Sequence, residues 1–167
     1  MASGKTTLGR ALARITGRDF IDLDFYIEQR FRKKIPEIFA ERGEEGFRRL
    51  ESAMLREAGE FENVIISCGG GTPCHADNME YMNSRGVTIR LEASIPVIVR
   101  RILLARGRRP IADKVPEKEL PDFVKKHLAE REPFYSQARF TIASDELENV
   151  RDIDRTALGT LNLLKNT

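Results

Sequence analysis

The stretch Met1-Ala2-Ser3-Gly4-Lys5-Thr6-Thr7 opens the chain and decides the fold. Gly4-Lys5-Thr6 is the second half of a phosphate-binding loop of the form G-x-x-x-x-G-K-[ST]. In such a loop the backbone N–H groups surround a phosphate, the lysine reaches the terminal phosphates, and the hydroxyl ligates Mg²⁺. The helix expected from Lys5 to Ile15 would direct its N-terminal dipole at the same anion. The alternative reading is an ordinary helix start, because G-K-T also occurs without a nucleotide.

The first half of this motif is not in the sequence, because its first glycine would fall two positions before Met1. The apolar strand that should lead into the loop would lie further upstream. We therefore expect that Met1 is not the natural start, and that the active molecule has about ten more residues forming a first strand.

The composition indicates a globular domain. The 167 residues are 41% hydrophobic and 32% charged, which fits a single domain, residues 1–167, with its own core. Basic and acidic residues nearly balance, 28 against 26, so a general nucleic-acid or membrane-surface binder is not expected. No apolar run approaches a membrane span, and we expect no secretory signal. We expect a cytoplasmic monomer with Cys68 and Cys74 as free thiols.

Apolar strands alternate with amphipathic helices along the whole chain. This alternation predicts an α/β fold with a parallel sheet covered on both faces, whose ligands bind beyond the carboxyl ends of the strands. The expected strands are residues 19–22, 64–67, 87–91 and 140–143. The expected helices begin near residues 5, 24, 36, 44, 76, 95, 118 and 150, and a glycine break separates the third from the fourth.

Two aspartates follow the first of these strands. In an extended Asp22-Leu23-Asp24 segment both carboxylates would point to one side. We interpret Asp22 as a Mg²⁺ ligand through water and Asp24 as the acceptor of a hydrogen bond from a substrate hydroxyl. We also expect Asp24 to cap the helix that follows; the structural alternative is that Asp24 does only this and that Asp22 is a solvated strand end.

Further candidates follow in the middle of the chain. Arg48 and Glu51 are three residues apart on one helix face, which suits either a surface ion pair or an arginine held ready for a substrate carboxylate. Gly69-Gly70-Gly71 follows a buried strand, where glycines allow close approach to a ligand; a flexible turn is the alternative. The aperiodic, basic stretch 106–116 predicts a lid rather than a solvated loop.

Taken together, these motifs resemble the shikimate kinase family over essentially the whole chain. They are the phosphate loop, the D-x-D pair, F-R-x-x-E at Phe47 to Glu51, the triple glycine, the R-P pair at Arg109-Pro110, and R-x-P-x-Y at Arg131 to Tyr135. The resemblance implies a three-layer αβα nucleoside-kinase-like fold with five parallel strands in the order 2-3-1-4-5. The first of these strands is the one largely missing here. It also implies transfer of the ATP γ-phosphate to the 3-hydroxyl of shikimate, on the route to chorismate.

The resemblance also implies site residues. Substrate would be held from helices spanning about residues 24–59 and from the triple glycine; the shikimate-binding residues are Asp24, Arg48, Gly70 and Arg131. ATP would be bound by Ser3, Gly4, Lys5, Thr6, Thr7, Arg106 and Arg109. The catalytic set is Lys5, Asp24 and Arg109. Mg²⁺ would be held by Thr6 and, through water, Asp22, with Ser67 nearby. Asp24 would either accept the hydroxyl proton or only orient the hydroxyl.

The chain departs from the family pattern at two places. Ala2 stands where the family usually has glycine, which would tighten the loop. The family often has a basic residue after the last strand, beside adenine, whereas this chain has Ser144-Asp145-Glu146. The competing functions are a gluconate or nucleoside monophosphate kinase of the same fold, and a non-catalytic nucleotide-binding module. Arg48 and Arg131 facing one acidic substrate beside Asp24 favour the shikimate kinase reading.

Overall fold

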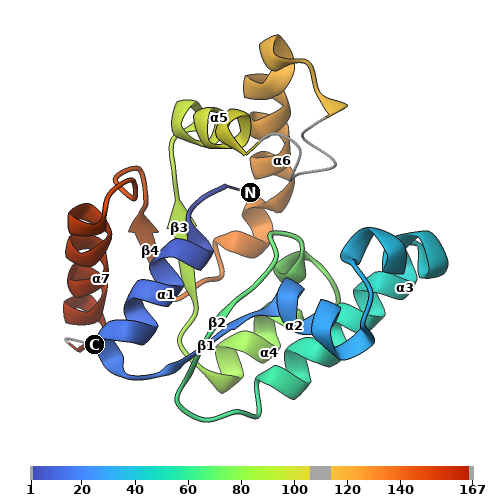
Figure 1. Cartoon of the computed structure of the whole chain (residues 1–167), viewed down its shortest axis with the longest axis horizontal. Coiled ribbons are helices and arrows are strands. Elements are labelled where there is room, and N and C mark those ends of the chain that lie inside the picture. Colours follow the sequence, from blue (N-terminus) through green and yellow to red (C-terminus); the bar gives the residue numbers. More distant parts are fainter. Residues whose placement is uncertain (1, 106–113, 166–167) are drawn as a thin grey trace.

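The computed structural model describes residues 2–105 and 114–165. Its strands form two parallel pairs (Figure 1). Strand β1 (Asp19–Asp22) pairs with β2 (Val64–Ser67), and β3 (Ile89–Glu92) pairs with β4 (Phe140–Ala143). In the first pair Asp22 lies opposite Ser67, so the polar ends of the two strands meet at the same edge.

The expected order 2-3-1-4-5 counts the missing strand as strand 1, so β1 to β4 correspond to its strands 2 to 5. The two observed pairs are therefore its outer pairs, 2-3 and 4-5. Within the described residues no strand joins β2 to β3, so the central position of that order is not observed. The third strand begins at Ile89 rather than at the expected Val87, which is exposed.

Helix α1 (Lys5–Thr16) packs across both strand pairs. Its buried residues Leu8 and Leu12 share a core cluster with Ile65 of β2, Leu91 of β3 and Ile142 of β4. The same cluster includes residues of α7 (Val150–Lys165), which lies beside α1 (Figure 1). As expected, Gly17 ends α1 in a left-handed conformation, with φ of 69°.

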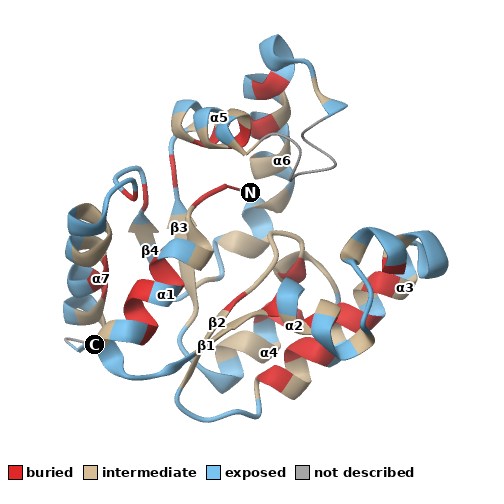
Figure 2. Cartoon of the chain, in the orientation of Figure 1, coloured by how far each residue is buried: buried red, intermediate tan, exposed pale blue. Residues whose placement is uncertain are grey.

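The opposite face of the β1–β2 pair is covered by other helices. Successive strand residues point to opposite faces, so Ile65 faces α1 while Ile66 packs in a second cluster. That cluster is built from α2 (Leu23–Phe31) and α3 (Ile35–Ala58). Figure 2 shows the buried residues concentrated where these helices and α1 meet the strands. The expected helical cover on both faces of a parallel sheet is therefore confirmed for this pair.

Helix α3 contains the break that the sequence predicted at Gly43, whose φ of 66° and ψ of −179° are not helical. The remaining helices are α4 (Asn78–Arg85), α5 (Ile95–Leu104) and α6 (Leu120–Tyr135), with short 3₁₀ turns η1 (Thr72–Cys74) and η3 (Glu117–Glu119). Helix α4 starts two residues later than expected, and α6 continues past Arg131 through Pro133. Within the described residues, no helix is long and apolar enough to cross a membrane.

Candidate active site

The candidate site lies where the phosphate loop meets the ends of β1 and β2. Thr6, in the first turn of α1, donates a hydrogen bond from its hydroxyl to Oδ2 of Asp22, over 2.9 Å. Gly4 takes a left-handed conformation with φ of 88°, and a Cβ there would lie 2.6 Å from Cδ1 of Leu147. Glycine is favoured at this turn chiefly by the backbone angle, because the tip of the Leu147 side chain could move away from an added Cβ.

Asp22, and not Asp24, caps helix α2, which corrects the expectation from the sequence. Oδ1 of Asp22 accepts from the backbone N–H of Phe25 over 3.4 Å, and the helix already begins at Leu23. The Asp22-Leu23-Asp24 segment is therefore not extended throughout, because Asp24 lies in the first helical turn. The two carboxylates nevertheless remain neighbours, since the charge of Asp22 helps to raise the pKa of Asp24.

Asp24 has the most informative electrostatics in the site. Its pKa is raised from 3.8 to about 6, first by loss of solvation and then by the negative charges of Asp22 and Glu51. The positive charges of Lys5 and Arg48 act in the opposite direction. Asp24 is exposed as a residue, but its Oδ1 lies only 3.1 Å from where a Cβ on Gly69 would be. The carboxyl end is thus pressed against the glycine turn while the rest of the residue contacts solvent.

Arg48 is held on one side by a buried carboxylate. Its Nη1 donates to Oε2 of Glu51 over 2.8 Å, and only 2% of the Glu51 side chain is exposed. On the outer side, Oε1 of Glu44 lies 3.7 Å from Nη2 of Arg48. The guanidinium also lies over the stacked rings of Phe39 and Phe47. This pair is largely buried, so the alternative of a surface ion pair is wrong.

The turn Gly69-Gly70-Gly71 leaves space for the side chains of Asp24, Arg48 and Glu51. A Cβ at Gly71 would lie 2.8 Å from both Nη atoms of Arg48, and a Cβ at Gly69 would crowd Asp24 and Glu51. The sequence predicted that glycines here allow a close approach by a ligand. In the structure, two of the three glycines leave room for the side chains of the site, and the close approach by a ligand stays a prediction.

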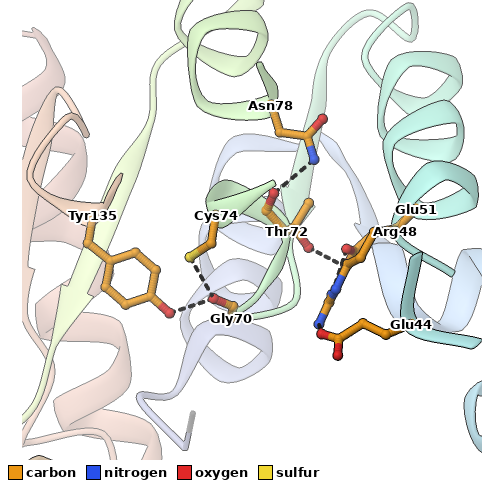
Figure 3. Close-up of polar contacts among 8 residues, drawn as sticks. All are labelled: Glu44, Arg48, Glu51, Gly70, Thr72, Cys74, Asn78 and Tyr135. Atoms are coloured by element: carbon orange, nitrogen blue, oxygen red, sulfur yellow. Dashed lines mark hydrogen bonds and ion pairs between the residues drawn. The ribbon is translucent and has the colours of Figure 1, made fainter. Parts of the chain in front are cut away.

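The end of α6 approaches the same turn from the other side (Figure 3). The hydroxyl of Tyr135 donates to the carbonyl of Gly70 over 2.6 Å. Arg131, one helical turn earlier, acts together with Arg48 to oppose the rise in the pKa of Cys74 that burial causes. The two arginines that the sequence singled out therefore face one loop from two different helices, α3 and α6.

Sequence reasoning missed Arg101 of α5, which joins three segments around the phosphate loop. Its guanidinium donates to the carbonyls of Ser144 and Asp145 over 2.9 and 3.0 Å, and to that of Ala2 over 3.5 Å. Asp145 in turn accepts from the backbone N–H of Ser94, just before α5. The acidic stretch after β4 thus anchors α5. An arginine pair in a mainly apolar helix was the only signal for Arg101 in the sequence.

The remaining predicted residues lie in the phosphate loop, in the predicted lid and at the end of β2. Ser3 and Gly4 lie in the loop, and Lys5, Thr6 and Thr7 form the first turn of α1. Arg106 and Arg109, with most of the predicted lid, lie outside the described residues. Ser67 is buried beside Asp22 at the strand end. In the described part of the chain, no group of three or more His, Cys, Asp or Glu side chains could hold a metal.

Comparisons with known proteins identify the family. The family model described as shikimate kinase matches residues 1–162. The chain belongs to the shikimate kinase family. A shikimate kinase from Phocaeicola vulgatus is 50% identical over 153 residues, 92% of this chain and 87% of the relative. One from Bacteroides thetaiotaomicron is 49% identical over 165 residues, 99% of this chain and 94% of the relative.

Solved shikimate kinases share the fold. The crystal structure of the Bacteroides thetaiotaomicron shikimate kinase matches with a TM-score of 0.95 at 49% identity, over 99% of this chain and 94% of the other. The Acinetobacter baumannii shikimate kinase in complex with shikimate matches with a TM-score of 0.86 at 31% identity, over 99% and 89%. The resemblance read from the motifs and the phosphate-loop kinase fold are confirmed.

Proposed function

We propose that this chain transfers the γ-phosphoryl group of ATP to the 3-hydroxyl of shikimate, in the pathway to chorismate and the aromatic amino acids. We further propose that it acts as a single-domain, cytoplasmic monomer. One observation carries the assignment of the site. The pKa of Asp24 responds to both Lys5 of the phosphate loop and Arg48 of α3. The groups proposed to hold the phosphoryl donor and the acceptor therefore both lie near one carboxylate.

Arg48 and Arg131 are proposed to bind the carboxylate of shikimate. Nε of Arg48 is buried and has no hydrogen-bond partner among the described residues, which is costly unless a ligand supplies one. A planar guanidinium suits a carboxylate because two parallel N–H donors match its two oxygens. Gly70 would line the same pocket through its backbone.

Asp24 is proposed to accept a hydrogen bond from the shikimate hydroxyl that is phosphorylated. With a pKa of about 6 it is ionised near neutral pH and still basic enough to take a proton. Orientation alone would also serve, because phosphoryl transfer through a loose transition state depends chiefly on positioning and charge neutralisation. Lys5 and the lid residue Arg109 would supply positive charge to the transferring group.

Mg²⁺ fits the oxygen atoms that the structure brings together. The Thr6 hydroxyl and the Asp22 carboxylate are hard oxygen ligands joined by a 2.9 Å hydrogen bond, and Mg²⁺ typically uses one or two such groups with phosphates and water. When bound, the ion would neutralise phosphate charge. ATP would contact Ser3, Gly4, Thr7 and the lid residue Arg106, and Ser67 would lie near the water shell of the metal.

Calorimetric titration of separate arginine variants tests this function. We expect Arg48→Ala and Arg131→Ala each to weaken shikimate binding by roughly 30-fold or more, since removing one end of a charged hydrogen-bonded pair costs about 2–5 kcal/mol. ATP affinity should stay nearly unchanged. Arg49→Ala is the matched control, because Arg49 is on the same helix but exposed and paired with Glu45. An equal loss of ATP and shikimate affinity would contradict the assignment.

A further inference from the structure

A buried hydrogen-bonded chain stands behind Arg48. Glu51 is almost fully buried, and each of its carboxylate oxygens has one donor among the described residues. Oε2 accepts from Nη1 of Arg48 over 2.8 Å, and Oε1 accepts from the hydroxyl of Thr72 over 2.6 Å. Thr72 itself is fully buried. The short distance to Thr72 is typical of a hydroxyl bonded to an ionised carboxylate, which is a strong interaction.

The backbone of Thr72 is fixed on both sides, so its hydroxyl has a defined position. Its N–H donates to the carbonyl of Gly69 over 3.2 Å. Its carbonyl accepts from Nδ2 of Asn78 over 2.8 Å, and Asn78 is fully buried (Figure 3). Oδ1 of Asn78 accepts in turn from Arg56 over 3.2 Å. The chain therefore runs from α3 through α4 and η1 back to α3.

We propose that Thr72 is a positioning residue for shikimate, acting through Glu51 on Arg48. The proposal rests on the proposed role of Arg48. A carboxylate can bind a guanidinium with both oxygens in parallel. With Oε1 held by Thr72, Glu51 engages Arg48 through Oε2 alone, and the rest of the guanidinium stays directed at the substrate carboxylate.

Without the Thr72 hydroxyl, Oε1 is left buried without its donor. Glu51 then turns to satisfy both oxygens on Arg48, because a buried unpaired carboxylate oxygen is unfavourable. The glycine turn restricts the guanidinium, since both Nη atoms of Arg48 lie only 2.8 Å from where a Cβ of Gly71 would be. Glu51 and shikimate then compete for the same donors, and the affinity for shikimate falls.

The test compares Thr72→Ser with Thr72→Ala, because the two variants lack the same methyl group and differ only in the hydroxyl. Dissociation constants for shikimate and ATP are measured by calorimetry on the full chain. We expect Thr72→Ala to bind shikimate at least about tenfold more weakly than Thr72→Ser, the change that 1.4 kcal/mol produces. Both variants should bind ATP alike. The methyl ester of shikimate, which lacks the negative charge, should show little difference between the two variants.

The control is Thr160→Val. Thr160 is also buried, but its hydroxyl bonds within α7 to the carbonyl of Thr156 over 2.8 Å, away from the site. Its substitution should alter thermal stability without altering shikimate affinity. Equal shikimate affinity of the Ser and Ala variants, or an equal shift in ATP affinity, overturns the role of Thr72. If Arg48→Ala also leaves shikimate binding unchanged, the proposed substrate site itself is wrong.

Discussion

Replacing Asp24 by asparagine should make the protein more stable at neutral pH while removing most of its turnover. A carboxyl whose folded pKa is raised from 3.8 to about 6 holds its proton more tightly in the folded state than in the unfolded one. Stability is therefore lost as the pH rises from about 4 to about 6, and stays low above that range. Asparagine has the same size but no such ionisation.

The magnitude follows from the shift. Raising the pKa from 3.8 to about 6 corresponds to about 3 kcal/mol at full strength. Because Asp24 is exposed as a residue, solvent screening reduces the expected gain to about 1 kcal/mol. The gain should be small near pH 3.5, where the wild-type carboxyl is mostly protonated in both states, and nearly complete by pH 7.5.

Urea denaturation of Asp24→Asn and wild type at pH 3.5, 5 and 7.5, followed by circular dichroism, measures this difference. Asp122→Asn is the control for loss of one exposed negative charge. A coupled ADP-release assay measures turnover, which should fall by roughly 100-fold or more if Asp24 takes the proton. The reasoning is refuted if the asparagine variant is less stable at pH 7.5, or if the difference does not change with pH.

Three further results are expected. Gly71→Ala should raise the KM for shikimate more than the KM for ATP, because the added Cβ would lie 2.8 Å from Arg48. Steady-state kinetics measures both constants, and an equal rise in the two would contradict this prediction. Ala2→Gly should stabilise the protein by about 0.5–1 kcal/mol in thermal melts, because Ala2 has a left-handed φ of 52° that only glycine adopts without cost; a lower melting temperature would contradict this. Cys68, whose pKa burial raises to about 12, should resist iodoacetamide at pH 8 as judged by mass spectrometry, and labelling as fast as in urea would disprove it.

Local sequence patterns predicted those parts of the fold that local physics controls. The strand at Val64 to Ser67, the end of α1 at Gly17 and the break at Gly43 were all predicted, because apolar runs and glycines act over a few residues. The motif order also identified the family. The cap of α2 was assigned to Asp24 instead of Asp22, because either aspartate satisfies the same pattern and only the bond to Phe25 distinguishes them.

Contacts between distant segments could not be predicted in this way. Arg101 bonds to carbonyls 43 and 44 residues later in the chain, and backbone carbonyls carry no sequence signal. The bond between Thr72 and Glu51 spans 21 residues and depends on how the glycine turn folds back onto α3. The roles assigned to Lys5, Asp24, Arg48 and Arg131 in binding and catalysis remain predictions.

The contact between the first and last helices has a consequence for synthesis on the ribosome. Arg14 of α1 forms an ion pair with Asp154 of α7, and Leu147 packs beneath Gly4 of the phosphate loop. These partners are translated about 140 residues apart. The β1–β2 pair with α2 and α3 can assemble early, because its partners are closer in the chain. The phosphate loop gains its final support only when α7 has left the exit tunnel, so nucleotide binding should not appear before that point.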